Sequence, residues 1–268
     1  MSNDAGQRRT VCILHLAFCI LLTSCAARLS LPVDPGTTLA DLAQIHMQVS
    51  EGCRGLRTFT AELSMAGRAG DDRLRGTVHA GFERPSSMRL EGVAPFGPPA
   101  FILASRDEAT VLLLPRDARA LRGAAPEDVL GALTGVALRP ADLMAVLTGC
   151  VMPAPNPMAG RVHANGWASI DLEGDARLYL RRVANAWQLR AATRSGWQIE
   201  YPVWRGAFPQ VVILRSVERA PLVDLRATIA QLEANGVIGR DAFTVDVPAS
   251  ARELTLEELR NAGPLRGQ

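Results

Sequence analysis

Apolar and polar side chains alternate from Thr58 onward, which leaves this chain few folds other than an antiparallel β-sheet. Successive side chains of a strand point to opposite faces of a sheet, so a period of two predicts a strand with one buried face. The first such strand is expected to bury Phe59, Ala61, Leu63 and Met65. A similar run spans Leu74 to Phe82, and the Gly70-Asp71-Asp72 turn between the two runs predicts a hairpin.

Strand-like segments recur along most of the remaining chain. They are predicted at residues 88–93, 100–105, 110–114, 118–122, 167–172, 177–182, 187–193, 197–204, 208–217, 223–229 and 243–247. Helical periodicity predicts short helices at residues 39–52, 126–135, 140–149 and 254–260, the second and third opened by Pro126 and Pro140. The pattern predicts an α+β fold, an open or partly closed antiparallel barrel whose helices cover its mouth or concave face.

The N-terminus has the form of a signal peptide. Arg8 and Arg9 precede an apolar run, Val11 to Leu22, which is too short to cross a bilayer. The run ends in Leu22-Thr23-Ser24-Cys25, which resembles the bacterial lipobox. We expect residues 1–24 to be removed, Cys25 to be acylated, and residues 25–37 to form a flexible tether. A secretory signal that happens to contain a cysteine is the alternative.

The residue after the expected anchor bears on the location. In bacteria whose sorting rules are known, Asp at this place retains a lipoprotein in the inner membrane, and this chain has Ala26. We therefore expect an outer-membrane protein, lipid-anchored and facing the periplasm. A compartment of that kind permits disulfides. Cys53 and Cys150 are the two cysteines left after the anchor, and they form either a disulfide or two free buried thiols.

Little in the sequence points to catalysis. The mature chain has three histidines, His46, His79 and His163, none at metal-ligand spacing from another His or a Cys pair. Ser195 lacks the Gly-x-Ser-x-Gly pattern of a nucleophile elbow. The net charge of +2 gives no nucleic-acid footprint. We expect no enzyme activity, no catalytic residue, no metal, no cofactor and no nucleic-acid partner.

The buried strand faces suggest a lipid cavity instead. Its expected lining is Phe59, Leu63, Met65, Val78, Phe82, Leu90, Leu189, Trp197 and Ile199. The expected lid residues, on the two central helices, are Leu130, Leu133, Leu143 and Leu147. An apolar cavity beside a membrane suits acyl chains. The other interpretation is a filled core, in which the same side chains simply pack against the helices.

Several short motifs, in order and suitably spaced, carry a family resemblance. They are the segment Arg89 to Gly97, the helix pair formed by Glu127 to Gly135 and Leu138 to Leu143, and the later Trp197-Gln198-Ile199-Glu200-Tyr201 and Phe208-Pro209. Together they resemble the LolB family, outer-membrane receptors that accept lipoproteins from a soluble periplasmic carrier. Phe96 stands where the family has Leu, the prolines at 153–157 are unusual, and residues 230–268 extend past the family's usual end.

The resemblance implies an antiparallel half-barrel of roughly eleven strands, with short helices forming a lid over a hydrophobic cavity. It implies one domain, residues 38–250, followed by a C-terminal helix and tail at 251–268. It further implies membrane lipids, lipoprotein acyl chains and a soluble periplasmic lipoprotein carrier as partners. The alternative is a lipid-anchored binding or sensor module of the same fold, for another amphiphile or for a protein partner.

One loop has a specific expected role. In the resembling family this loop presents an exposed apolar residue to the membrane, which implies that Pro95, Phe96 and Gly97 form a membrane-inserting loop. Pro95 and Pro98 stiffen the segment, so the Phe96 ring cannot easily fold back. The alternative is that Phe96 tucks under the neighbouring strand edge.

Overall fold

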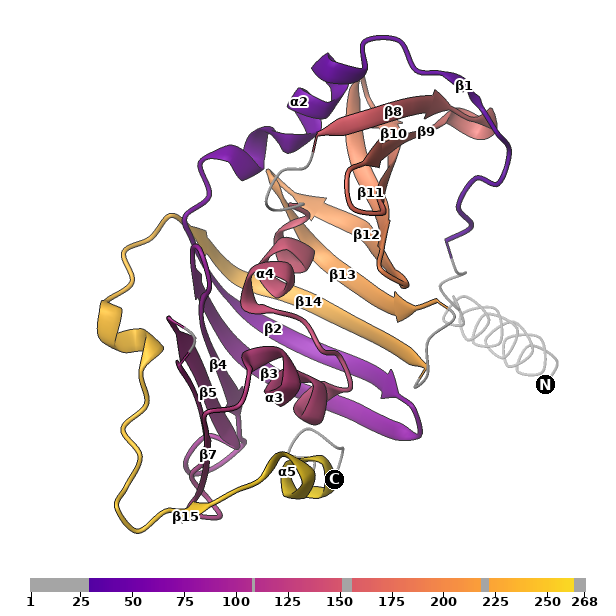
Figure 1. Ribbon diagram of the computed structural model, residues 1–268. Coiled ribbons are helices and arrows are strands. Elements are labelled where there is room, and N and C mark those ends of the chain that lie inside the picture. Colours follow the sequence, from indigo (N-terminus) through magenta and orange to yellow (C-terminus); the bar gives the residue numbers. More distant parts are fainter. Residues whose placement is uncertain (1–28, 108, 151–155, 218–221, 263–268) are drawn as a thin grey trace, which may run out of the picture. The chain divides into compact units, whose positions relative to one another are not determined.

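Fifteen strands join in one sheet within the part of the chain that the structure describes (Figure 1). The computed structural model describes residues 29–107, 109–150, 156–217 and 222–262, and every element lies in one compact unit, residues 32–268. The strands are β1 (Thr37–Thr38), β2 (Thr58–Ala69), β3 (Asp72–Glu83), β4 (Ser87–Val93), β5 (Phe101–Arg106), β6 (Ala109–Leu114), β7 (Arg119–Arg122), β8 (Pro157–Val162), β9 (Trp167–Leu172), β10 (Ala176–Val183), β11 (Ala186–Arg194), β12 (Trp197–Arg205), β13 (Phe208–Ser216), β14 (Val223–Ala234) and β15 (Arg252–Glu253).

The sheet consists of two meanders joined side by side. Its order is β1-β8-β9-β10-β11-β12-β13-β14-β2-β3-β4-β5-β6-β7-β15. The meanders meet where β14 pairs with β2. Gly67 allows the two strands to approach there, because a Cβ at this residue would lie 2.1 Å from the Asp224 carbonyl oxygen. All strand pairs of the sheet are antiparallel except β15 with β7.

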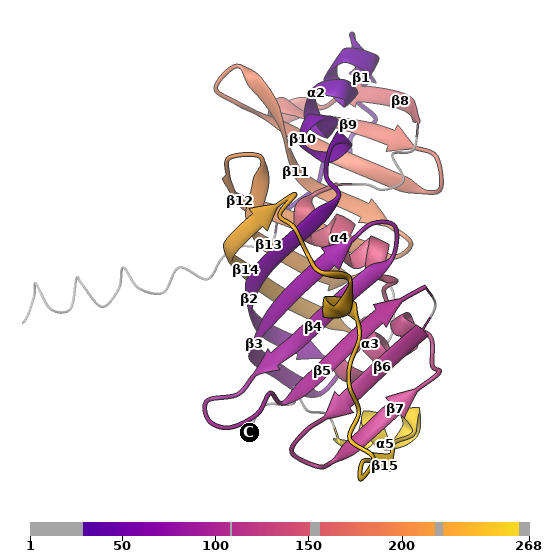
Figure 2. The same ribbon diagram turned by 90° about the vertical axis from the view of Figure 1, so that its left-hand side faces the viewer.

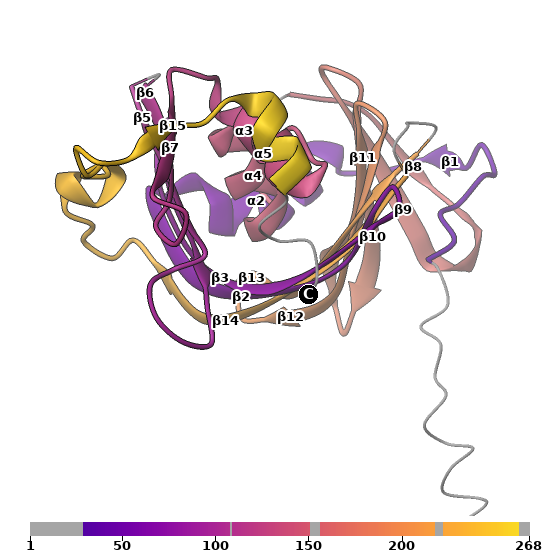
Figure 3. The same cartoon turned by 90° about the horizontal axis from the view of Figure 1, so that it is seen from below.

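The pair of helices between β7 and β8 lies inside the curve of the sheet (Figure 3). They are α3 (Pro126–Thr134) and α4 (Pro140–Thr148), each with a proline at its first position, where no backbone N–H is required. Each ends at a glycine in the left-handed conformation, Gly135 and Gly149. The other helices are α2 (Leu42–Arg54) and α5 (Leu256–Ala262), with 3₁₀ turns at Ala164–Gly166 and Arg240–Phe243. Within the described residues no helix is long and apolar enough to span a membrane.

The structure confirms the predicted fold class, an α+β protein with a large antiparallel sheet and short helices. It has more strands than the roughly eleven expected. The two-residue strands β1 and β15 are too short to show a pattern in the sequence. Strand β8 begins at Pro157, and proline is tolerated there because it is the first residue of the strand and β1 pairs only with Arg161 and Val162.

The strand predicted at residues 243–247 is wrong. Phe243 instead ends a 3₁₀ turn and is buried against the outer face of the sheet. Arg89 holds the following backbone, because its Nη1 donates to the carbonyl oxygens of Ala242 and Thr244, both at 3.0 Å. Phe243 therefore packs onto the sheet, and the segment does not join it as a strand.

The C-terminal segment wraps from the outer face of the sheet to the helices (Figure 2). After the Arg240–Phe243 turn it pairs β15 with β7 and then forms α5, which packs against α3. Thr255 and Glu258 cap α5 reciprocally: the Thr255 amide donates to Glu258 Oε2 at 2.9 Å, and the Glu258 amide donates to Thr255 Oγ1 at 3.2 Å. Leu259 is fully buried. The segment predicted as a C-terminal helix and tail thus contributes to the same core.

The predicted signal peptide (residues 1–24), Cys25 and the first residues of the predicted tether lie outside the described residues. Cys53 of α2 and Cys150, directly after α4, are joined by a disulfide.

Candidate functional site

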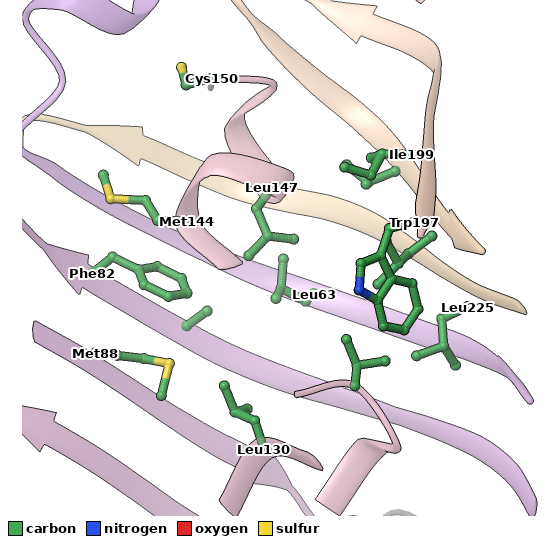
Figure 4. Packing of buried hydrophobic residues seen from close by; sticks show 14 of the residues in the cluster. Leu63, Phe82, Met88, Leu130, Met144, Leu147, Cys150, Trp197, Ile199 and Leu225 are labelled. Carbon is green, nitrogen blue, oxygen red and sulfur yellow. The ribbon is translucent and has the colours of Figure 1, made fainter. Parts of the chain in front are cut away.

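A small apolar cavity, the central cavity, lies between the concave face of the sheet and helices α3 and α4. Its volume is about 90 Å³. The sheet contributes Leu63, Met65, Val78 and Leu90, and the helices contribute Leu130, Leu133, Leu143 and Leu147. Figure 4 shows the side chains of Leu63 and Leu147 pointing toward one another. The cavity arises because β2, β3 and β4 each turn alternate apolar residues to this face, while each helix turns a stripe of leucines toward it.

A second cavity, the lateral cavity, lies on the side of α4 toward β10–β12. Its volume is about 220 Å³. Trp197, Ile199 and Tyr201 line it from β12. Burial raises the pKa of the Tyr201 hydroxyl well above its usual value, so this side chain stays neutral. The lateral cavity has more polar residues in its lining, namely Arg139, Asp142, Thr193, Arg194 and Ser195, whereas the central cavity has Thr134 and Arg226.

The two cavities adjoin across α4. Leu138, Val146 and Leu214 line both of them. Neither cavity alone reaches the roughly 300–1,000 Å³ that is usual for a ligand pocket. Helices α3 and α4 cover much of the concave face between the two cavities.

Most of the predicted lining residues meet at these cavities. All four lid leucines and six of the nine predicted sheet residues line one or the other. Phe59, Phe82 and Leu189 are buried but line neither cavity. Phe59 packs against Phe82, with ring centroids 6.2 Å apart, and against Phe208 at 6.3 Å. These rings close the end of the core where β2 begins.

Both ends of α4 are fastened. Asp142, in its first turn, accepts hydrogen bonds from Arg139 Nε at 2.8 Å and from Arg194 Nη1 of β11 at 3.1 Å. The hydrogen bond to Asp142 raises the pKa of Arg139 above its usual value. The Cys53–Cys150 disulfide fixes the other end to α2. The sequence did not single out Asp142, because an acid in the first turn of a helix usually only complements the helix dipole.

Replacing Asp142 with alanine is expected to loosen the start of α4. Its carboxylate is 16% exposed, whereas Arg139 and Arg194 are 62% and 36% exposed, so solvent screens the pairs and the loss should be about 1 kcal/mol. Hydrogen exchange should quicken at the α4 amides. The control is Asp128→Ala, because Asp128 also lies in a helix first turn, is exposed, and has no ion pair among the described residues. Equal exchange in both variants would show that the pairs do not hold α4.

The loop between β4 and β5 presents Phe96 to solvent. The side chain is 87% exposed. Gly97 has a φ of 78°, a conformation that glycine adopts without strain. Arg116 fixes the loop by donating to the carbonyl oxygens of Phe96 and Pro98. The Phe96 ring is therefore exposed and not tucked under the neighbouring strand edge, and Arg116 holds the backbone of its loop.

The described residues contain no group of three or more His, Cys, Asp or Glu side chains placed to hold a metal. His79 lies on the outer face, with Nε2 3.6 Å from Glu62. The side chain of His163 is buried, and its ring nitrogens contact Asp34 and the Ser169 hydroxyl, so it fastens the segment before β1 to β9. The partners of His79 and His163 are thus side chains that hold neighbouring segments of the fold together.

No family model and no curated protein matches this sequence. Several solved structures are similar to it, among them the following three. A LolA superfamily protein from Nitrosomonas europaea is 9% identical, covers 76% of this chain and 97% of its own, and has a TM-score of 0.49. A domain assigned as an outer membrane lipoprotein-sorting protein from Vibrio parahaemolyticus is 8% identical, with coverages of 75% and 94% and a TM-score of 0.46. MucB is 14% identical, with coverages of 81% and 66% and a TM-score of 0.35.

Proposed function

We propose that this protein binds the acyl chains of lipoproteins under helices α3 and α4 and releases them into the outer membrane. The observation that supports this most strongly is the pair of adjoining apolar cavities beneath two short helices. Cavities in this position offer acyl chains an apolar surface once the helices move. No cofactor or nucleotide is needed for such binding.

The energetics suit a transfer protein. Each methylene removed from water contributes about 0.8 kcal/mol, so an acyl chain gains by entering the concave face. The chain must displace leucines of α3 and α4 that already cover this face, such as Leu130 and Leu147. Because one apolar contact replaces another, the net affinity stays small. A weakly held chain can leave for a bilayer, where its contacts are at least as favourable.

The proposal includes location and partners. The lipobox-like Leu22-Thr23-Ser24-Cys25 supports a lipid anchor at Cys25 in the outer membrane, facing the periplasm. A soluble periplasmic carrier would supply the lipoprotein. Mass spectrometry of the mature N-terminus tests the anchor: a terminus other than acylated Cys25 would contradict it.

Native mass spectrometry of the full-length chain carrying Cys25→Ala tests the binding function, since this chain lacks the proposed acylation site. We expect co-purified lipoprotein or fatty acyl chains, and saturable binding of a fluorescent fatty acid. The small cavity volumes favour a second candidate, a module that recognises a protein partner with its core filled. An empty protein that binds no fatty acid but retains a protein partner would support that candidate and contradict acyl transfer.

Replacing Phe96 with glutamate, in the same Cys25→Ala background, is expected to reduce liposome association roughly tenfold or more. Transfer of an exposed phenylalanine ring out of water is worth roughly 1.5–3 kcal/mol, and this ring is largely exposed in the folded protein. Stability and fatty-acid binding should remain nearly unchanged, because surface substitutions usually alter stability by less than about 0.5 kcal/mol.

The matched control is Val237→Glu, which also introduces an acid at a fully exposed apolar residue, close to where β14 ends. Liposome association should be normal in this variant. A Phe96→Glu protein that loses several kcal/mol of stability would show that Phe96 belongs to the core, and equal losses of association in both variants would show a general effect of charge.

A further inference from the structure

Three arginines lie together on the outer face of the sheet, on β2 and β3. Arg68 and Arg73 are directly opposite each other in the β2–β3 ladder, and Arg75 lies two residues further along β3. Leu74 and Val78 of β3 are buried, and Val78 lines the central cavity, so the alternating Arg73 and Arg75 point to the opposite, outer side. We refer to Arg68, Arg73 and Arg75 as the arginine cluster.

The side chains of the arginine cluster make few bonds within the described part of the protein. Among the described residues, the guanidinium groups of Arg73 and Arg75 have no hydrogen-bond or ion-pair partner, and Arg68 donates only to the Asp71 carbonyl oxygen at 3.5 Å. Asp224 lies opposite Arg68 in the β14–β2 ladder, but Arg215 Nε donates to this carboxylate at 3.1 Å. Like charges directly opposite in a ladder are destabilising. The pairing of Arg68 with Arg73 therefore does not stabilise the hairpin, which suggests an external anion.

The cluster lies at the end of the sheet that presents apolar loop tips. The last pair between β3 and β4 is Thr77 with Val93, and Arg75 and Arg73 follow on the part of β3 that extends beyond it. The loop bearing Phe96 starts after Val93, at the same end. Leu222, 72% exposed, is fixed there as well, because the Gly70 amide donates to its carbonyl oxygen at 2.7 Å.

We propose that Arg68, Arg73 and Arg75 form a docking surface for the anionic headgroups of a lipid bilayer, next to the Phe96 loop. This inference rests on the proposed delivery of acyl chains to a membrane. At a bilayer surface, negative phosphate groups lie above the hydrocarbon. The exposed side chains of Phe96 and Leu222 can enter the hydrocarbon while the arginine cluster contacts the phosphates. A bilayer is favoured over an acidic protein because Phe96 and Leu222, the exposed apolar residues described at this end, lie on two separate loops.

Vesicle co-sedimentation tests the proposal with the full-length chain carrying Cys25→Ala. Vesicles of phosphatidylcholine alone are compared with vesicles containing phosphatidylglycerol. Each arginine near an anionic surface strengthens binding roughly fivefold, so Arg73→Gln with Arg75→Gln should weaken binding to phosphatidylglycerol vesicles roughly 10- to 30-fold. The preference for phosphatidylglycerol should also decrease at high salt.

The control removes the same charge elsewhere, with Arg57→Gln and Arg205→Gln. Arg57 and Arg205 are exposed and lie at the opposite end of the sheet, at the start of β2 and the end of β12. Binding that weakens only in the Arg73/Arg75 variant supports the docking surface. Equal weakening in both variants, no preference for phosphatidylglycerol, or binding to an acidic protein but not to vesicles would overturn it.

Fatty-acid binding, measured on the same variants, keeps the two proposals apart. It should be unchanged in both double variants, because no substituted residue lines the central or the lateral cavity. Normal fatty-acid binding without a phosphatidylglycerol preference would reject the docking surface and leave the acyl-binding function standing. Absent fatty-acid binding in the unsubstituted chain would reject the acyl-binding function itself.

Discussion

Replacing Cys150 with serine is expected to lower the free energy of unfolding by roughly 2–5 kcal/mol. The Cys53–Cys150 disulfide spans 97 residues, and closing so long a loop removes much of the conformational freedom of the unfolded chain. This loop contains β2–β7 and helices α3 and α4. Chemical denaturation of the oxidised protein and of the variant measures the difference.

Cys53→Ser should give the same loss as Cys150→Ser, and reduction of the unsubstituted protein should reproduce both. Adding the second substitution to the first should cost little more, since the two side chains act as one unit. If the oxidised protein and the variants unfold at the same denaturant concentration, the bond contributes nothing to stability.

The second large effect is expected for Leu63→Arg. Leu63 is 3% exposed at the middle of β2 and faces Leu147 of the lid. A buried guanidinium without a partner costs several kcal/mol, so the variant should lose stability and fatty-acid binding together. Circular dichroism and fluorescent fatty-acid titration measure the two effects.

The adjacent residue provides the matched control. Ser64 is exposed on the outer face of the same strand, so Ser64→Arg should keep both the fold and the binding. Leu63→Ala separates the two effects, because it leaves a cavity without a charge and should destabilise by about 2–5 kcal/mol. A folded Leu63→Arg protein that binds fatty acid normally would refute a binding site at this face.

The sequence predicted the sheet where each strand has one buried and one exposed face. The hairpin β2–β3 is the clearest case, since the alternation around Leu63 and Val78 needs no information beyond neighbouring residues. The limits of α3 and α4 were predictable for a similar local reason, because proline opens and glycine ends each helix. The course of the segment after β14 was not predictable in this way. Phe243 packs on strands more than a hundred residues away in the chain, and Arg89 of β4 holds the backbone beside it by hydrogen bonds.

The candidate site was predictable in its composition and less so in its geometry. Alternation identified Leu63, Met65 and Val78 as inward-facing, and they do line a cavity. The same rule could not separate them from Phe59, because a residue's position along a strand decides whether it meets a cavity or a neighbouring ring. The ion pair between Asp142 and Arg194 could not be predicted either, since it joins residues 52 apart in the sequence.

The two edges of the sheet have a consequence for solubility. At one edge the chain adds the two residues of β1, and at the other the two residues of β15, each across only part of its neighbour. Long unpaired strand edges recruit strands from other molecules, and short ones give such pairing few hydrogen bonds. An open sheet this large would otherwise invite aggregation, and here its own terminal segments protect it.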